Sequence, residues 1–291
     1  MTHTIKNEFM TVTAAQKGAE LQSISGADGT EYLWQGDPAY WSDRALNIFP
    51  YVARLTDGSY YLDGELHHME IHGIAPYRNF RLAHLDETRM VLELQSDEQT
   101  HAQYPRDFVF RIIYELCGDT LAIIYEVENR DDRCMYFGLG GHPGFRVPLV
   151  EGNCFEDYRL RFGSGCQPER VGFNEACFVT GQTEPFPLED GRTILLRHEL
   201  FDNDAIVLTG VDHQVTLQAE GDSHFVTVTY PQMDYLGLWH WPKIDAPYIC
   251  IEPWCSLPSM ANRIAVFEEQ KDLIQLESGK TYRNRWTIRI G

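Results

Sequence analysis

One segment of the chain reads Phe108-Val109-Phe110-Arg111-Ile112-Ile113-Tyr114-Glu115-Leu116. Its even-numbered positions are all apolar or aromatic, and the charged residues Arg111 and Glu115 fall only at odd-numbered positions. Alternation with period two is typical of a β-strand that packs one face against the core and turns the other face to water. The segment therefore predicts a half-buried strand of an antiparallel sheet.

The same pattern extends outward from this segment in both directions. Residues 211–219 and 286–290 alternate in the same way, and residues 90–94 and 121–125 are apolar runs of strand length. Asp-Gly pairs, such as the one at 57–58, separate the strand candidates as turns do. We expect a strand content well above the ~20–25% of average globular proteins.

Helical periodicity is scarce along the chain. The best helical candidates are two short pieces, 200–204 and 260–267. A parallel α/β fold needs long helices between its strands, so this class is disfavoured. No linker rich in proline, glycine or serine and no internal repeat divides the chain. We predict one all-β domain over residues 1–291, built as a large antiparallel β-sandwich.

The charge of the chain limits its partners. The sequence has 24 Lys and Arg against 43 Asp and Glu, a formal net charge of −19 at pH 7. Such a field repels phosphate backbones, so nucleic acid and anionic membranes are poor partners. No apolar run approaches the ~18 residues that a membrane span requires. We expect neither a nucleic-acid nor a membrane partner.

Seven cysteines occur at irregular spacings, and no two of them form a Cys-x-x-Cys pair. This argues against a zinc ribbon or a thioredoxin-like site. The first residues, Met1–Glu8, contain no apolar signal core. We therefore expect a cytoplasmic location, with the thiols reduced and acting as small core residues.

Two segments interrupt the strand pattern with titratable side chains. His142 lies in the glycine-rich segment 138–145, where glycine lets a ligand approach the backbone closely. Glu252 ends the apolar run 248–251, and an isolated buried carboxylate would be costly unless it is paired, metal-bound or functional. His142 is then a candidate proton donor, and Glu252 a candidate base whose pKa burial would raise. Spacing alone leaves open an ordinary loop histidine and a solvent-facing glutamate.

A third segment, His67-His68-Met69-Glu70-Ile71-His72, is rich in metal-ligand types. In an extended strand, His68, Glu70 and His72 would share one face. This spacing could hold a metal ion, as in a cupin-like enzyme. The other interpretation is a solvated strand face on which only one histidine matters.

Arg54 and three tryptophans are candidates for contact with a polar ring-shaped ligand. Arg54 follows the apolar segment 49–53, where it could bind hydroxyls or form an ordinary surface salt bridge. Trp239, Trp241 and Trp254 flank the Glu252 segment and could form a stacking wall or belong to the core.

Several short motifs occur in a common order along nearly the whole chain. Together they resemble the aldose 1-epimerase (galactose mutarotase) family, and within it the LacX-like branch. The matching pieces are Lys17-Gly18-Ala19-Glu20-Leu21-Gln22-Ser23-Ile24, Tyr32-Leu33-Trp34, Asn47-Ile48-Phe49-Pro50 with Arg54, His72-Gly73, Gly141-His142-Pro143, Leu200-Phe201-Asp202-Asn203-Asp204-Ala205, and Ile251-Glu252-Pro253-Trp254.

The resemblance implies a galactose mutarotase-like supersandwich with an open cleft. It also implies that Glu252 is the general base for the anomeric hydroxyl and His142 the general acid for the ring oxygen. His72 corresponds to a second histidine that hydrogen-bonds and polarises the sugar. Arg54 corresponds to an arginine that holds substrate hydroxyls, and Trp239 joins the set as a stacking surface for the sugar.

Two positions are less settled by the resemblance. Asp204 corresponds to a sugar-binding aspartate, with Asp202 as a close competitor. The family often has an aromatic residue and an arginine after His-Gly, whereas this chain reads His72-Gly73-Ile74-Ala75-Pro76-Tyr77-Arg78. Arg78 is therefore the candidate for the arginine that the motif lacks.

The resemblance implies an isomerase that interconverts the α and β anomers of a hexose by acid–base ring opening. That chemistry has no redox step, so no cofactor and no metal are expected, and the partner is a small sugar. A homodimer is left open. Two alternatives are a sugar-binding or regulatory protein that lacks catalysis, and the metal-dependent cupin-like enzyme.

Overall fold

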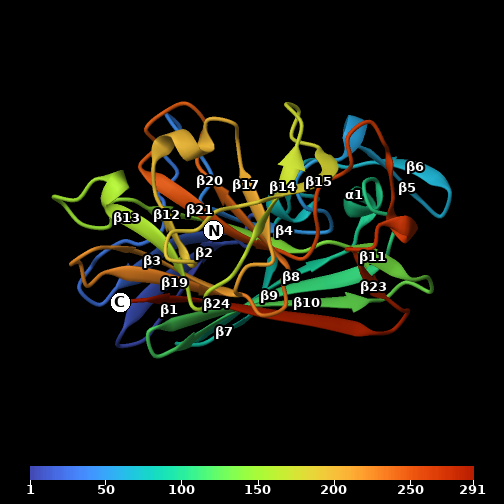
Figure 1. The fold of residues 1–291 in the computed structure, drawn as a ribbon. Coiled ribbons are helices and arrows are strands. Elements are labelled where there is room, and N and C mark those ends of the chain that lie inside the picture. Colours follow the sequence, from blue (N-terminus) through green and yellow to red (C-terminus); the bar gives the residue numbers. More distant parts are fainter.

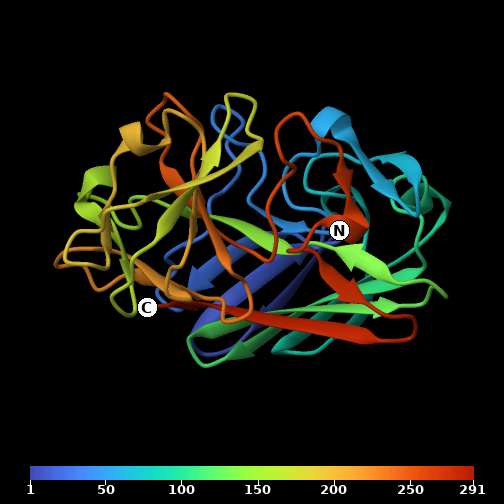
Figure 2. The same cartoon turned by 45° about the vertical axis from the view of Figure 1, so that its right-hand side comes forward.

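The computed structural model describes residues 1–291, and strands account for 48% of them. Two large sheets dominate the molecule, and Figures 1 and 2 show them as stacked layers. Every strand pair within the two large sheets is antiparallel. The predicted all-β fold with a large antiparallel sandwich is confirmed.

The larger sheet has nine strands, and it forms the lower layer in Figure 1. In spatial order they are β16 (Thr193–Leu195), β13 (Tyr158–Phe162), β18 (Gln214–Ala219), β19 (Phe225–Thr229), β24 (Thr281–Ile290), β10 (Thr120–Asn129), β9 (Phe108–Cys117), β8 (Arg89–Gln95) and β7 (Arg81–Leu85).

The second sheet has seven strands and carries the site described below. In spatial order they are β15 (Val179–Pro185), β14 (Glu169–Phe173), β17 (Ile206–Thr209), β20 (Tyr235–Trp239), β21 (Tyr248–Trp254), β12 (Gly140–Arg146) and β4 (Ala45–Ile48).

Smaller elements complete the fold. Three small sheets contain β1 (Thr2–Lys6), β2 (Met10–Ala15) and β3 (Leu21–Gly26); β22 (Ala265–Val266), β5 (Ser59–Leu62) and β6 (Glu65–His68); and β11 (Met135–Phe137) and β23 (Ile274–Leu276). The helices are α1 (Glu98–His101) and the 3₁₀ turns η1 (Thr56–Gly58), η2 (Ala75–Tyr77), η3 (Phe155–Asp157), η4 (His198–Phe201) and η5 (Phe267–Glu269).

Of the two short helices predicted from the sequence, one overlaps an observed helical turn and the other is absent. The piece at 200–204 overlaps the short turn η4. The helix expected over 260–267 is wrong, because that stretch is a turn followed by β22. Asn262 lies in the left-handed region with φ 60°, which interrupts a right-handed helix.

The strand predicted over residues 108–116 is confirmed as β9, but its outward face differs from the prediction. Phe110, Ile112 and Tyr114 are fully buried in a cluster of 65 core residues between the layers. The other face of the strand is not fully exposed to solvent, because Ile113 is also buried there. It lies opposite Val91 and Ile124 on the neighbouring strands, and the three form a small apolar cluster.

All seven cysteines are free, as expected for reduced thiols. Their predicted place in the core is wrong for Cys117 and Cys154, which are exposed, and holds fully only for Cys250. No sequence pattern around these two cysteines distinguishes exposed from buried positions. No helix has the length and apolar character needed to span a membrane.

A buried asparagine ties the two large sheets together beneath the site. Asn47, on β4, donates from its amide to the carbonyl oxygens of Gly18 and Ala19 and to the hydroxyl of Tyr114, at 3.0–3.1 Å. Its carbonyl oxygen accepts from the hydroxyl of Tyr125 at 2.8 Å. Both tyrosines belong to the nine-stranded sheet, so the side chain of Asn47 connects the seven-stranded sheet to the other layer.

We predict that Asn47→Ala lowers the free energy of unfolding by about 2–4 kcal/mol, because it removes four buried hydrogen bonds and leaves the carbonyl oxygen of Gly18 without its partner. Denaturant unfolding measures this. Asn79→Ala, on the surface, is the control and should change stability by less than about 0.5 kcal/mol. An Asn47 variant as stable as this control would contradict the bridging role.

Candidate active site

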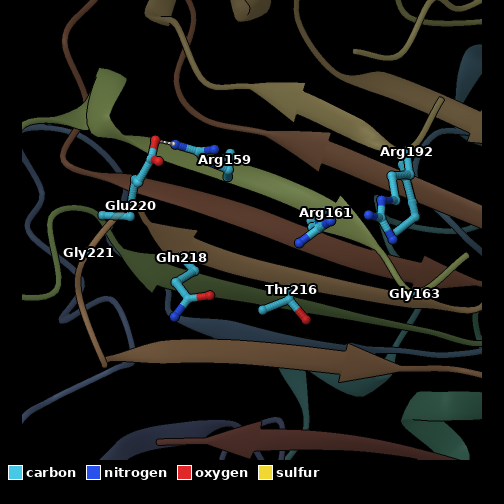
Figure 3. Close-up of a pocket in the computed structure, with 10 residues that line it drawn as sticks. Arg159, Arg161, Gly163, Arg192, Thr216, Gln218, Glu220 and Gly221 are labelled. Carbon is cyan, nitrogen blue, oxygen red and sulfur yellow. Dashed lines mark hydrogen bonds and ion pairs between the residues drawn. The ribbon is translucent and has the colours of Figure 1, made fainter. Parts of the chain in front are cut away.

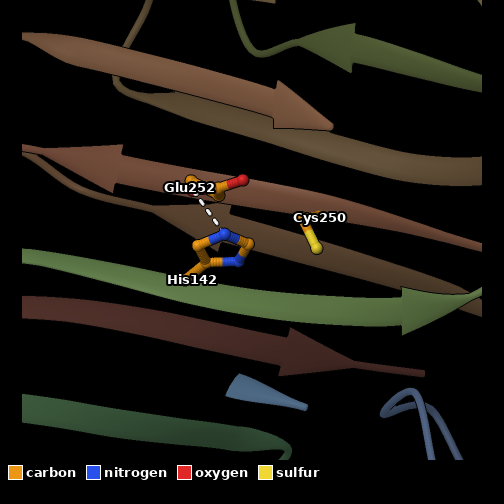
Figure 4. A group of neighbouring side chains, drawn as sticks. All are labelled: His142, Cys250 and Glu252. Atoms are coloured by element: carbon orange, nitrogen blue, oxygen red, sulfur yellow. Dashed lines mark ion pairs between the residues drawn. The ribbon is translucent and has the colours of Figure 1, made fainter. Parts of the chain in front are cut away.

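The site is built on the pairing of two neighbouring strands. In the register of β12 with β21, Gly140 lies opposite Trp254 and Gly144 opposite Cys250, which places His142 opposite Glu252. The Nε2 atom of His142 lies 3.3 Å from a carboxylate oxygen of Glu252. Figure 4 shows the imidazole turned toward the carboxylate. Both residues are buried, Glu252 with only 2% of its surface exposed.

Glycines on the same strand face make room around this pair. Gly144 stands two residues after His142, and a Cβ atom there would lie 3.0 Å from the ring of Trp41. Gly237, on β20, is the partner of Glu252 on its other side, and a Cβ there would lie 3.2 Å from the Cβ of Glu252. The glycines that the sequence showed around His142 therefore allow a tryptophan to pack beside the pair.

His72 reaches the pair from a loop rather than from a strand. Its backbone has φ 63°, and its amide donates to the carbonyl of Ala53 at 2.9 Å. The next residue, Gly73, lies so close to Phe49 that a Cβ would be 2.3 Å from the carbonyl oxygen of Phe49. Only glycine fits there, and this contact holds the loop in place. The rings of His72 and His142 have centroids 5.3 Å apart.

This loop corrects the prediction of a metal site at His68, Glu70 and His72. Strand β6 ends at His68, so the three residues do not share an extended face. The Nδ1 atom of His68 hydrogen-bonds the hydroxyl of Ser59, Glu70 is exposed, and only His72 joins the buried site. The spacing argument was wrong because the strand ends at His68 and the chain turns at Ile71 and His72.

Aromatic rings cover one side of the pair. The ring of Trp41 lies 4.9 Å from that of His142 at 31°, and Trp239 lies 5.7 Å from His142 and edge-on to it. Trp41 and Trp239 are themselves 5.6 Å apart. Sequence reasoning missed Trp41, because it lies in a loop with no alternating pattern. Trp241 is 48% exposed. Trp254 is buried two residues after Glu252 on β21, and its side chain, as a hydrogen-bond donor, opposes the rise in the pKa of Glu252.

Polar groups from three further segments lie around the site. The carboxylate of Asp204 accepts a hydrogen bond from the thiol of Cys177 at 3.0 Å, and its charge raises the pKa of Glu252. Asp202 instead acts on the pKa of His240. The geometry therefore brings Asp204, and not Asp202, near Glu252. Arg54 is exposed, and its positive charge helps to lower the pKa of His72.

The side chain of Arg78 bonds Gln99 and is not one of the groups that meet around His142 and Glu252. Its two terminal nitrogens bond the side chain and the carbonyl oxygen of Gln99, at 2.6 and 2.9 Å. The guanidinium is therefore engaged beside α1, which begins at Glu98. The structure therefore gives no support to the expectation that Arg78 supplies the arginine missing after His72-Gly73, because its guanidinium bonds Gln99 instead.

Burial favours uncharged forms of all three titratable groups. It raises the pKa of Glu252 well above its ordinary value, and the carboxylate of Asp204 raises it further. It lowers the pKa of His142 well below its ordinary value, with His72 adding to the effect, and it lowers the pKa of His72 to about 4. These shifts favour the uncharged carboxyl of Glu252 and the uncharged imidazoles of His142 and His72.

One set of side chains in the structure could hold a metal ion. His142, Cys250 and Glu252 offer donor atoms that all lie within 4.8 Å of one another, and all three residues are buried. They lie on β12 and β21, at the position of the acid–base pair itself.

A hollow on the surface lies away from this pair. It has a volume of about 440 Å³ and lies on the outer face of the nine-stranded sheet, where Arg159, Arg161 and Arg192 gather (Figure 3). Its one carboxylate, Glu220, is paired with Arg159 at 2.6 Å, and no histidine lines it. Its lining residues include no histidine–carboxylate pair of the kind formed by His142 and Glu252.

Comparison with known proteins finds a matching family model and two similar curated proteins. The family model described as aldose 1-epimerase matches residues 1–289. The plasmid and chromosomal forms of protein LacX from Lactococcus lactis subsp. lactis are each 29% identical over 299 residues, which cover 100% of this chain and 99% of each relative. The resemblance to the LacX-like branch is confirmed.

Two solved structures share the fold. A galactose mutarotase related enzyme from Lactobacillus acidophilus has a TM-score of 0.94 and 28% identity, covering 100% of this chain and 97% of its own. A galactose mutarotase-like protein from Lactobacillus casei ATCC 334 has a TM-score of 0.93 and 27% identity, covering 100% of both chains. The predicted galactose mutarotase-like architecture is confirmed.

The raised pKa of Glu252 predicts a pH-dependent effect of Glu252→Gln on stability. The folded wild type binds the proton more tightly than the unfolded chain, so this stabilisation is complete below the ordinary value of 4.5 and is lost as pH rises through the folded value. Glutamine cannot ionise and has no such loss. The variant should gain stability relative to wild type as pH rises from about 4.5, with no gain below it.

Denaturant midpoints measured from about pH 4 to about pH 8 follow this gain. Glu65→Gln is the matched control, because Glu65 is exposed on β6, and its difference from wild type should stay small throughout. A Glu252→Gln variant that loses stability as pH rises would show that the carboxylate is stabilised in its charged form.

Proposed function

The chain belongs to the aldose 1-epimerase family, and from this we propose that it is an isomerase that interconverts the α and β anomers of a hexose. The observation that carries the proposal is the pair formed by Glu252 and His142. A proton acceptor and a proton donor face each other 3.3 Å apart, buried and beside aromatic rings. Anomer exchange requires one base and one acid on the two sides of the C1–O5 unit of a sugar ring.

Ring opening uses both groups in one transfer. Glu252, as the carboxylate, accepts the proton of the C1 hydroxyl. The C1–O5 bond breaks, its electron pair goes to O5, and O5 takes a proton from the imidazolium of His142. The product is the open-chain aldehyde beside a neutral carboxylic acid and a neutral imidazole.

Ring closure returns the protons. After rotation about C1–C2, O5 attacks the other face of the carbonyl and gives its proton to His142, while Glu252 returns a proton to O1. Atoms and charges balance over the cycle, so the proposed reaction uses no cofactor. Burial favours the neutral pair, which is the protonation state after ring opening. Sugar hydroxyls in the cleft then stabilise the charged form that opens the ring.

The surrounding side chains suit a sugar. We assign His72, neutral near pH 7, to a hydrogen bond with the substrate. Arg54 and Asp204 are assigned to ring hydroxyls, as donor and acceptor. Trp41 and Trp239 offer aromatic surface for the C–H faces of the ring.

The charge of the protein favours a neutral substrate. A net charge of −19 repels anions, and Asp204 adds a negative charge near Glu252. We therefore propose a neutral hexose rather than a sugar phosphate. The test is saturation-transfer NMR on a panel of anomerically pure sugars and sugar phosphates. Sugar binding without faster exchange would instead support the sugar-binding alternative.

We predict that Glu252→Gln and His142→Asn each lower kcat by about 10²–10⁴-fold, the usual contribution of a general acid or base. Anomer exchange by NMR measures this, and thermal melts confirm that both variants fold. The double variant should lose far less than the product of the two factors, because both groups act in one transfer. Near wild-type exchange in Glu252→Gln would defeat the mechanism.

Arg54→Ala should behave differently. A hydroxyl contact that is equally strong in the ground state and the transition state is uniform binding, so its loss should mainly raise KM and leave kcat close to wild type. Arg263→Ala, an exposed arginine paired with Glu269, is the control and should change neither constant. A fall in kcat without a change in KM would move Arg54 from binding to chemistry.

A further inference from the structure

Cys250 has no part in the proposed mechanism, although it lies beside the acid–base pair. It precedes Glu252 by two residues on β21, so both side chains leave the same face of the strand. Its side chain is fully buried, and its Sγ atom makes no hydrogen bond. Figure 4 shows the thiol next to the imidazole of His142.

The three side chains present a nitrogen, an oxygen and a sulfur to one point. Their donor atoms all lie within 4.8 Å of one another, and the histidine and carboxylate atoms are already 3.3 Å apart. A tetrahedral Zn²⁺ with bonds of about 2.0–2.3 Å holds its donors about 3.5 Å apart. Small side-chain rotations therefore suffice to close the set around one ion.

An unsatisfied buried atom points to the same place. The carboxylate oxygen of Glu252 that faces His142 is fully buried and makes no hydrogen bond of good geometry. Buried polar atoms without partners are rare in folded proteins, and a bound ion is one of their ordinary explanations. The negative charge of Asp204 acts on this carboxylate as well, and it would attract a cation.

We propose that His142, Cys250 and Glu252 form a binding site for a thiophilic divalent cation, represented by Zn²⁺, and that the bound ion inhibits the isomerase. The inhibition rests on the proposed function, whereas the binding does not. The ion occupies the lone pairs that Glu252 and His142 need for proton transfer. A thiolate and an imidazole select zinc-like ions over Mg²⁺ and Ca²⁺, which prefer oxygen donors.

The geometry leaves one coordination position open. Three protein donors with a fourth position for water or a sugar hydroxyl is the arrangement of open zinc sites. A Lewis-acid role for the ion is thus the chief competing interpretation. The two interpretations predict opposite effects of Zn²⁺ on anomer exchange.

Binding is tested first, without reference to activity. Metal-free wild type is titrated with Zn²⁺ by calorimetry and with Co²⁺ by absorption, where a thiolate ligand produces a charge-transfer band. We expect one tight site, loss of the Co²⁺ band in Cys250→Ser, and Zn²⁺ affinity lower by more than about 10-fold, since even the partners of metal ligands contribute that much. An unchanged band or affinity would overturn the site.

Two further variants keep this test decisive. Cys250→Ala removes the sulfur without burying a hydroxyl and should behave like the serine variant, which separates metal binding from any loss of folding. Cys177→Ser is the matched control, because this thiol is bonded to a single carboxylate, Asp204. It should keep the affinity and the band of wild type; loss of either would move the metal to Cys177.

Activity then tests the inhibition. Zn²⁺ should suppress anomer exchange by wild type, and a chelator should restore it. Cys250→Ser should retain exchange and require more than about 10-fold higher Zn²⁺ for the same suppression. Activation by Zn²⁺ would overturn the inhibition. If the protein bound Zn²⁺ through Cys250 but did not exchange anomers of any sugar, the proposed function would be wrong and the metal site would stand.

Discussion

The antiparallel pairing of β12 with β21 is the constraint on which the rest of the site depends. It puts His142 and Glu252 on one face at opposed positions, 3.3 Å apart, although 110 residues of sequence separate them. Because side chains alternate between strand faces, a shift of this register by one residue would turn one of the two groups into the core. The glycines beside them, Gly144 and Gly237, keep the neighbouring space open for aromatic rings.

The sandwich supports this pairing by burying groups that water would otherwise stabilise. Glu252 is 2% exposed, and its pKa rises because the charged form is poorly solvated there. The same burial lowers the pKa of His142. One strand pair thus carries two pKa shifts of opposite sign, and both favour the uncharged form of the group. In the proposed reaction this uncharged pair is the state that follows ring opening, and closing is the same transfer reversed.

Burial also explains why one place supports both a proposed reaction and a proposed inhibitor. One carboxylate oxygen of Glu252 and the Nδ1 atom of His142 are buried without a hydrogen-bond partner. Such groups can move protons, and they can equally bind a metal ion. The thiol of Cys250 adds the soft donor. The hollow with three arginines on the far sheet shows the contrast: its charges are exposed or paired across the surface, and no acid–base pair arises there.

By itself, the sequence determined the all-β class, the strands around residues 108–116 and the pairing candidates His142, Glu252 and His72, because period-two alternation and short motifs are local properties of the chain. Tertiary structure alone decided the rest. The turn after His68 dispersed the predicted metal set, Arg78 bonded Gln99 instead of entering the site, and Trp41 and Cys250 came to lie against His142. These outcomes depend on contacts between segments distant in sequence, and no local pattern records which segments will meet.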